Sequence, residues 1–284
     1  MKIDRRLWLK ALASLPLAAA LPSHAEESNT LEAIRQRGRL RIAVYNDFAP
    51  YSNAGKGIDV DIATAIAGKL GLTAEVVSFK SDDDMNDDLR NMVWKGHYLG
   101  TKPADVMMHV PVDEHLARAN DKVRIFGSYH RESLAVARDP ARITKPIAGS
   151  AAVALEIFTR EKIGVETATL SDSFLLAVLN GRLRSNIVHY KNVALAAQGL
   201  SNGEVSAVLA PRAELEAALA GQTRLPVEPA NLAELKVGGW PIGMAVKVEE
   251  MALAETLTAA LADLKREGVV AEIFRKYGVT YQAA

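Results

Sequence analysis

The sequence of 284 residues contains no cysteine, and this absence excludes several kinds of protein at once. Without cysteine there is no disulfide framework, no thiolate nucleophile, no thiolate zinc site and no cysteine-bound iron–sulfur cluster. The chain also lacks an excess of one charge, since 34 Lys and Arg residues balance 34 Asp and Glu residues. Binding to nucleic acid needs a basic face, whereas basic and acidic residues alternate here throughout. The composition therefore argues against both a nucleic-acid-binding protein and a thiol enzyme.

Long hydrophobic runs are also missing, apart from one near the start of the chain. Residues 11–21 are apolar but too few for a membrane span, which needs about 20 residues. They follow a basic segment, and small residues lead to Ala25, as in an export signal. We expect residues 1–25 to be a signal peptide cleaved after Ala25, and the mature protein to be periplasmic. Residues 4–10 resemble a twin-arginine signal, and an ordinary secretory signal is the alternative.

Beyond residue 37, short β-rich runs alternate with helical patterns. Residues 39–45 predict a strand, and residues 59–70 predict a helix because Ile62, Ile66 and Leu70 recur at intervals of four residues. The alternation predicts further strands at 72–79, 104–110, 132–138, 186–190, 205–209 and 242–247, and helices at 84–95, 113–119, 151–162, 171–180, 191–200 and 251–265. This order indicates an α/β protein, with enough length for one large or two medium domains.

Segments at both ends of this pattern resemble the type II periplasmic solute-binding proteins, in their amino-acid-binding, family 3-like branch. The sequence Phe48-Ala49-Pro50-Tyr51-Ser52 and residues 57–63 are similar to the first loop and helix of that family. Residues 240–247 and 264–278 are similar to its C-terminus, and the similarity covers nearly all of residues 38–279. It implies an α/β fold of two lobes, joined by crossing strands near 132–138 and 239–247, that close over a ligand.

The resemblance also implies where each lobe lies in the chain. Lobe one comprises residues 26–134 and the returning segment 242–284, and lobe two comprises residues 135–241. Ligands of such sheets bind at the carboxyl ends of strands. The family implies a binding protein rather than an enzyme, with no metal and no cofactor. The residues that the family match assigns to the cleft are Phe48, Tyr51, His109, Val110 and Pro111 of lobe one, and Ser150, Ala151, Pro211 and Arg212 of lobe two.

Members of that family bind the carboxylate and the ammonium group of a free amino acid with two charged side chains, and both are missing from this sequence. These proteins hold the substrate carboxylate with the Arg of a Thr-x-x-Arg pattern, and here Leu116 takes that place, with Arg118 two residues on. They hold the substrate ammonium with an Asp after a lobe-two strand, and here Pro211 takes that place. Each lost charge-assisted contact costs about 2–5 kcal/mol. We therefore expect no tight binding of a free α-amino acid.

A long connector points to a narrower group of relatives. Residues 86–100, running into 103–113, together with residues 180–190 and 210–214, resemble the solute-binding-like proteins associated with pyrroloquinoline-quinone (PQQ) alcohol dehydrogenases. These are the J-type accessory proteins of the methanol dehydrogenase systems. The resemblance implies a periplasmic accessory that aids the assembly or activation of a PQQ-dependent alcohol dehydrogenase, with the cytochrome c of that enzyme as a further candidate partner. The alternative is an ABC-transporter substrate-binding protein for a small molecule other than a standard amino acid.

The connector contains a candidate partner surface, made of Arg90, Trp94, His97 and Tyr98. Aromatic residues and arginine dominate interface energies, so these residues suit a contact with the dehydrogenase. The alternative is that they pack as a support for lobe one.

Three other motifs favour ordinary structural roles. Residues 199–203 match G-x-S-x-G, but the predicted order is helix then strand, whereas a nucleophile elbow links a strand to a helix. His109 and His115 flank two acidic residues and could suggest a metal site, but the better interpretation is a hydrogen-bonding role for His109 in the cleft, with the acidic pair in the first turn of a helix. The acidic run at residues 82–88 lacks the pattern of a calcium loop and is typical of a capped helix start.

Overall fold

The structure is a computed structural model, and it describes residues 31–82 and 84–284. The expected signal peptide, and with it cleavage after Ala25, lies outside the described residues. Within these two ranges, no helix combines the length and the apolar character that crossing a membrane requires.

Lobe one contains a five-stranded mixed sheet in the order β4-β1-β5-β14-β6. Strand β1 runs parallel to β4 and β5, while β14 runs antiparallel to β5 and β6. Strand β6 was not predicted from the sequence, and it pairs with β14 from the far end of the chain. The returning segment therefore completes this sheet. The strands are β1 (Arg39–Tyr45), β4 (Thr73–Phe79), β5 (Val106–Pro111), β6 (Val123–Glu132) and β14 (Trp240–Lys247).

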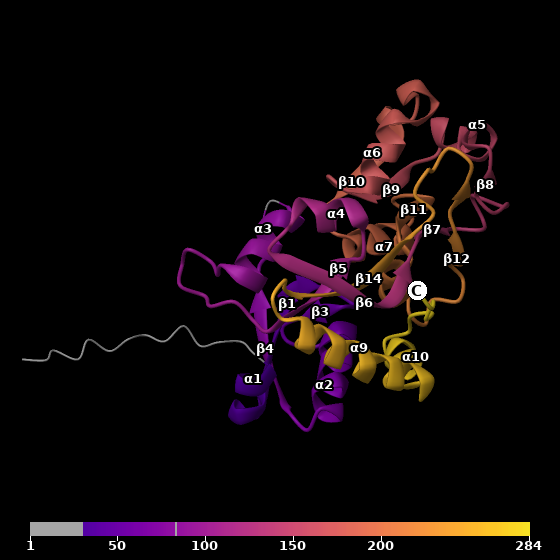
Figure 1. Ribbon diagram of the computed structural model, residues 1–284. Helices are drawn as coiled ribbons and strands as arrows, with labels where there is room; N and C mark the ends of the chain where they lie inside the picture. Colours follow the sequence, from indigo (N-terminus) through magenta and orange to yellow (C-terminus); the bar gives the residue numbers. More distant parts are fainter. Residues whose placement is uncertain (1–30, 83) are drawn as a thin grey trace, which may run out of the picture.

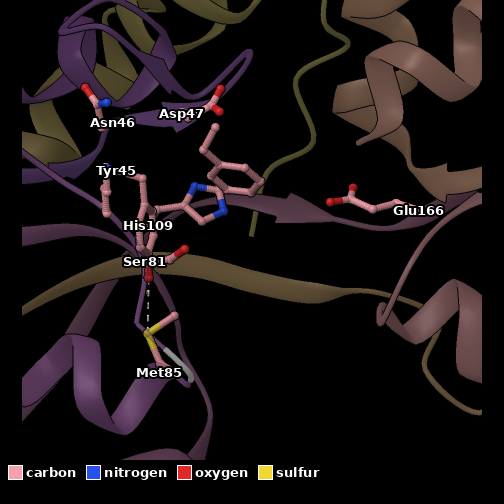
Figure 2. Close-up of a pocket in the computed structure, with 9 residues that line it drawn as sticks. Tyr45, Asn46, Asp47, Ser81, Met85, His109 and Glu166 are labelled. Carbon is pink, nitrogen blue, oxygen red and sulfur yellow. Dashed lines mark hydrogen bonds between the residues drawn. The ribbon is translucent and has the colours of Figure 1, made fainter. Parts of the chain in front are cut away.

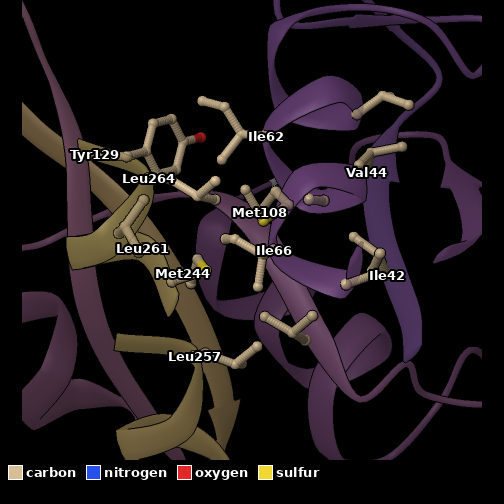
Figure 3. Close-up of a cluster of buried hydrophobic side chains, with 14 of the residues drawn as sticks. Ile42, Val44, Ile62, Ile66, Met108, Tyr129, Met244, Leu257, Leu261 and Leu264 are labelled. Atoms are coloured by element: carbon tan, nitrogen blue, oxygen red, sulfur yellow. The ribbon is translucent and has the colours of Figure 1, made fainter. Parts of the chain in front are cut away.

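Helices α2 and α9 bury one face of this sheet, although they come from opposite ends of the chain (Figure 1). Figure 3 shows Ile62 and Ile66 of α2 facing Leu257 and Leu261 of α9, and all four side chains are buried. Full burial of each such side chain contributes roughly 1.5–3 kcal/mol. The helices of lobe one are α1 (Leu31–Arg37), α2 (Ile58–Lys69), α3 (Met85–Leu89), α4 (Glu114–Ala119), α9 (Met251–Arg266) and α10 (Val269–Lys276).

Lobe two contains a second five-stranded sheet, in the order β10-β9-β11-β7-β12. Strands β9, β10 and β11 are parallel, and β7 is antiparallel to both of its neighbours. Apolar clusters cover both faces. The elements are β7 (Leu134–Arg138), α5 (Ala151–Ala154), β9 (Ile163–Glu166), α6 (Leu170–Ala177), β10 (Ile187–Tyr190), α7 (Val193–Ser201), β11 (Ala207–Pro211), α8 (Arg212–Ala218) and β12 (Val227–Pro229).

Three predicted helices are interrupted in the structure. The one expected at 171–180 divides into α6 and the 3-10 turn η3 (Val178–Gly181). The helix expected at 84–95 begins at an N-cap, where the Asp84 carboxylate accepts hydrogen bonds from the backbone N–H groups of Asn86 and Asp87, and it continues after Leu89 as a π-helix, η1 (Arg90–Trp94). The helix expected at 151–162 divides into α5 and the 3-10 turn η2 (Glu156–Thr159). The remaining short elements are β2 (Asp47–Phe48), β3 (Ser52–Asn53), β8 (Ala148–Gly149), η4 (Arg184–Asn186) and β13 (Asn231–Leu232).

The chain passes between the lobes twice. The first passage is short, because β6 ends at Glu132 and β7 begins at Leu134. The second passage, residues 233–239, leads from β13 to β14. The structure thus has the α/β, two-lobed fold that the sequence predicted.

Candidate functional site

Two adjoining cavities, of about 630 and 430 Å³, lie between the lobes. Both are lined by Asp47 and Phe48 of lobe one and by Glu166 of lobe two, so they form one interlobe groove. Its walls come from the ends of β1, β5 and β9, from the segments that follow β1, β4 and β10, from the first residues of α3 and α7, and from α8. The carboxyl ends of parallel strands meet at one edge of a sheet, which is where ligands of α/β sheets bind. The groove is therefore the candidate functional site.

The lobe-one wall is aromatic. The ring of His109 lies edge-on to Phe48, at 4.7 Å between ring centroids, and at 4.2 Å from Tyr51. Phe48 is half-buried, and Tyr51 is buried behind it. Figure 2 shows Glu166 extending toward this wall from the other lobe. The groove thus offers a flat apolar face on one side and a carboxylate on the other.

His109 occupies an irregular place in its strand. Val110 pairs with Gly243 and Met108 with Met244, so His109 is the extra residue of a β-bulge. Its backbone φ is 61°, in the left-handed region, which costs a non-glycine residue about 1 kcal/mol or more. Bulges of this kind redirect a side chain and are common beside functional sites. The bulge explains how an imidazole from a buried strand reaches the groove.

A buried network fixes the His109 ring. Its Nδ1 lies 3.1 Å from the Asp59 carboxylate, which also accepts a short hydrogen bond from the Tyr129 hydroxyl. The backbone N–H of His109 donates to that same hydroxyl at 3.2 Å. With Nδ1 facing Asp59, the other ring nitrogen is left for the groove.

Glu132 connects the aromatic wall to the first interlobe passage. One carboxylate oxygen accepts the Tyr51 hydroxyl hydrogen at 2.6 Å, and the other accepts the backbone N–H of Ser133 at 2.7 Å. Burial raises the pKa of Glu132, although both of these hydrogen bonds act in the opposite direction. The Tyr51 loop is therefore tied directly to the residue at which the chain leaves lobe one.

The lobe-two wall carries two carboxyl groups, from Glu166 at the end of β9 and Glu214 in the first turn of α8. Burial raises the pKa of Glu166, and the backbone N–H of Val193 partly offsets this. The pKa of Glu214 is raised well above its ordinary value, first by burial and then by the nearby carboxylates of Glu166 and Glu132. The two lysines of the groove, Lys80 and Lys191, are exposed.

The predicted lobe-one residues divide between groove and core. Phe48 and His109 line the groove, Tyr51 is buried behind them, and Pro111 is half-buried at the end of β5. Val110 lines neither cavity, because the residue after the bulge points into the core cluster that contains Met107.

None of the four predicted lobe-two residues lines either cavity. At the start of α5, the Glu234 carboxylate accepts hydrogen bonds from the backbone N–H of Ala151, at 2.7 Å, and from the Ser150 hydroxyl, at 3.3 Å. Pro211 ends β11, and the Arg212 guanidinium is bound to Glu216 at 2.6 Å. Sequence reasoning chose the start of α8 and missed Glu214, which lies two residues further on and does line the groove.

The four connector residues of the predicted partner surface differ in their burial and in their contacts. Arg90 pairs with Asp87, and Trp94 is half-buried against the core of lobe one. The rings of His97 and Tyr98 stack at 4.3 Å, and Tyr98 is 88% exposed. Trp94 thus packs partly against the lobe, whereas Tyr98 is exposed to solvent, and the role of this surface in binding a partner stays a prediction.

The remaining candidates from the sequence are Arg118, the suggested metal site and the G-x-S-x-G motif. Arg118 is exposed and pairs with Glu114 on its own helix. Among the described residues, no group of three or more His, Asp or Glu side chains converges to hold a metal ion. The G-x-S-x-G match falls at the end of α7, before a strand, which is the wrong order for a nucleophile elbow.

Comparison with known proteins identifies the fold of this chain but does not assign it to a protein family. No protein-family model and no curated protein matches the sequence. An ancestral cationic amino acid solute-binding protein matches with a TM-score of 0.68 at 20% identity, over 87% of this chain and 98% of that one. A polar amino acid ABC uptake transporter substrate-binding protein from Streptococcus thermophilus matches with a TM-score of 0.66 at 16% identity, over 92% and 94%.

A third structure, an amino acid ABC transporter substrate-binding protein from Streptococcus pneumoniae bound to L-arginine, matches with a TM-score of 0.60 at 21% identity, over 88% of this chain and 98% of that one. These likenesses show that the chain has the two-lobed fold of periplasmic amino acid solute-binding proteins. Another match is described as an ancestral amino-acid-binding protein, a precursor of cyclohexadienyl dehydratase, so the fold alone does not exclude an enzyme. The narrower resemblance to quinoprotein accessory proteins stays a prediction.

Proposed function

We propose that this protein is an exported solute-binding protein that encloses a small ligand in the interlobe groove. The observation that carries this proposal is the groove itself, with an aromatic wall from one lobe facing carboxylates from the other. The volume of each of its two cavities falls within the roughly 300–1,000 Å³ typical of small-molecule sites. The fold neighbours named as transporter substrate-binding proteins support the same class.

The ligand in this proposal differs from a free α-amino acid. Binding such a ligand tightly needs a cation for its carboxylate, and the Arg212 guanidinium is already bound to Glu216. Arg118 is 76% exposed and pairs with Glu114, so it offers no replacement inside the groove. This protein therefore shares the fold of the solved solute-binding proteins and, in our proposal, their binding role, but it binds a different class of ligand.

Calorimetry on the exported protein tests both parts. We expect none of the standard amino acids to bind with a Kd below about 1 mM. Native mass spectrometry of the protein purified from the periplasm should reveal a retained small molecule, or scattering should reveal compaction when a periplasmic extract is added. Micromolar binding of a standard amino acid would contradict the ligand assignment. The absence of any bound or compacting molecule would contradict the binding function.

A second candidate function is the accessory role beside a PQQ-dependent alcohol dehydrogenase, which the connector favours. Tyr98 and Leu99 are 88% and 75% exposed, and exposed apolar side chains next to each other suit a protein contact. In this case the Tyr98→Ala, Leu99→Ala double variant should lose co-purification with the dehydrogenase and its cytochrome c while keeping its thermal stability. Trp94→Ala serves as the contrasting variant. It removes a half-buried side chain that packs on the core of lobe one, so we expect it to lower the thermal stability. Unchanged co-purification and dehydrogenase activity with the double variant would remove this candidate.

A further inference from the structure

The 430 Å³ cavity of the groove carries more carboxyl groups than cations. Asp47, Glu166 and Glu214 line it, and Lys191 is the one basic residue in its lining. The structure gives the Glu214 carboxyl no hydrogen bond and no ion pair with the described residues, and the pKa of this group is raised by burial and then by Glu166 and Glu132. Glu214 is half-buried, and an ionised carboxyl group in such a place without a partner is costly, so an opposite charge on a ligand would lower that cost.

The positive charges near the groove are either used elsewhere or exposed. Arg212 is bound to Glu216, and Lys80 and Lys191 are exposed. One nitrogen of His109 faces Asp59. A cleft with an excess of carboxylates attracts ligands of the opposite sign, so the cavity that Glu166 and Glu214 line favours cations over anions.

The size and lining of the groove favour an organic cation over a metal ion. Nowhere in residues 31–82 and 84–284 do three or more acidic or histidine side chains converge as metal ligands. The cavities of about 630 and 430 Å³ are far larger than an ion. Phe48 lines both cavities, and an aromatic face near a carboxylate binds both the carbon skeleton of an amine and its charge.

We infer that the ligand is an organic cation, an amine or quaternary ammonium compound without a carboxylate, whose charged group lies between Glu166 and Glu214 and whose apolar part packs on Phe48. This inference rests on the proposed binding function and narrows it to a ligand class. A primary ammonium would donate hydrogen bonds to the two carboxylates, whereas a quaternary ammonium would rely on charge and on the Phe48 ring.

Calorimetry with matched probes tests the inference. Benzylamine, 1,4-diaminobutane and choline are the cations, benzyl alcohol is the neutral isostere of the first, and benzoate is the anion. We expect at least one cation to bind at least about tenfold more tightly than benzyl alcohol and benzoate. Glu214→Gln and Glu166→Gln should each weaken that binding by about tenfold or more, whereas Glu255→Gln, an exposed residue on α9, should leave it unchanged. Phe48→Leu should weaken choline more than 1,4-diaminobutane.

The outcomes separate the inference from the proposed function. If benzoate or benzyl alcohol binds as well as the cations, or if no cation binds, the inference is overturned. The retained molecule in native mass spectrometry then decides independently whether the protein binds a solute of another class. If a cation binds and Glu214→Gln has no more effect than Glu255→Gln, the assigned position of the charge is wrong. Thermal melts of all variants without ligand exclude loss of folding as the cause.

Discussion

His109 and Asp59, fifty positions apart in the chain, meet inside lobe one with 3.1 Å between Nδ1 and a carboxylate oxygen. Asp59 lies in the first turn of α2, and His109 is the extra residue of the bulge in β5. The Tyr129 hydroxyl bridges the two, since it donates to Asp59 and accepts from the His109 backbone. The groove-facing imidazole is thus held by three segments of lobe one.

Tyr129→Phe should reveal how much the hydrogen bonds of the Tyr129 hydroxyl contribute to the unfolding free energy. The change removes only a hydroxyl, but it leaves one oxygen of the buried Asp59 carboxylate and the backbone N–H of His109 each without a partner, at a cost of about 1–3 kcal/mol. Urea unfolding measures the loss. The matched control is Tyr281→Phe, because the Tyr281 hydroxyl forms no hydrogen bond with any described residue, and we expect a change within about 0.5 kcal/mol. Equal effects of the two substitutions would contradict the role of the bridge.

The sequence predicted those elements whose signal is local. Residues 39–45 form the strand that their β-rich composition indicates, and α2 differs from its prediction by one residue at each end. Strand β6 escaped prediction because it contains Gly127 and several charged residues, and its partner β14 lies more than a hundred residues away. Pairing with a strand so far away in the chain does not produce a recognisable hydrophobic pattern in the sequence of β6.

The site was less predictable than the fold, for two different reasons. The bulge at His109 depends on the register between β5 and β14, and no local pattern encodes register. In contrast, the pairing of Arg212 with Glu216 follows the i, i+4 spacing of a helix and was readable once α8 had been recognised. The unpredicted helix therefore explains why the sequence analysis named Arg212, which lines neither cavity, and did not name Glu214, which lines one of them.

Gly57→Ala should disrupt the loop that carries the aromatic wall. Gly57 has a φ of 141°, and an added Cβ would lie 2.2 Å from the Tyr51 carbonyl oxygen. Since that atom belongs to the backbone, the loop must move, and we expect a loss of about 2–4 kcal/mol in unfolding free energy. Gly68→Ala is the control on the same helix, because its Cβ meets nothing within 4 Å. There alanine should stabilise by about 0.5–1 kcal/mol. A stable Gly57→Ala protein would contradict this account of the loop.

His130 should make the protein acid-sensitive. Burial, followed by the neighbouring His109, lowers the pKa of His130 from 6.5 to about 4, so the folded state keeps this ring neutral. The unfolded chain binds the proton first as the pH falls, and stability that is present above pH 6.5 is lost toward pH 4, by about 3 kcal/mol. His130→Phe preserves an aromatic ring against Phe274 and should remove this slope. Unfolding curves between pH 7 and 4 measure how the unfolding free energy depends on pH. The same dependence in the wild type and in His130→Phe would contradict the role of His130.

Glu214 should act on stability in the opposite direction. Its pKa in the folded protein is raised well above 4.5 by burial and by the carboxylates of Glu166 and Glu132. As the pH rises above 4.5, the unfolded chain releases this proton while the folded state retains it, so stability falls until the folded pKa is passed. Glu214→Gln cannot titrate, and without ligand it should match the wild type near pH 4 and exceed it by about 1–2 kcal/mol at pH 8. Glu255→Gln should follow the wild type at every pH. A Glu214→Gln protein that is less stable at pH 8 would mean that Glu214 is ionised and paired in solution, against the unpartnered carboxyl on which the cationic ligand was inferred.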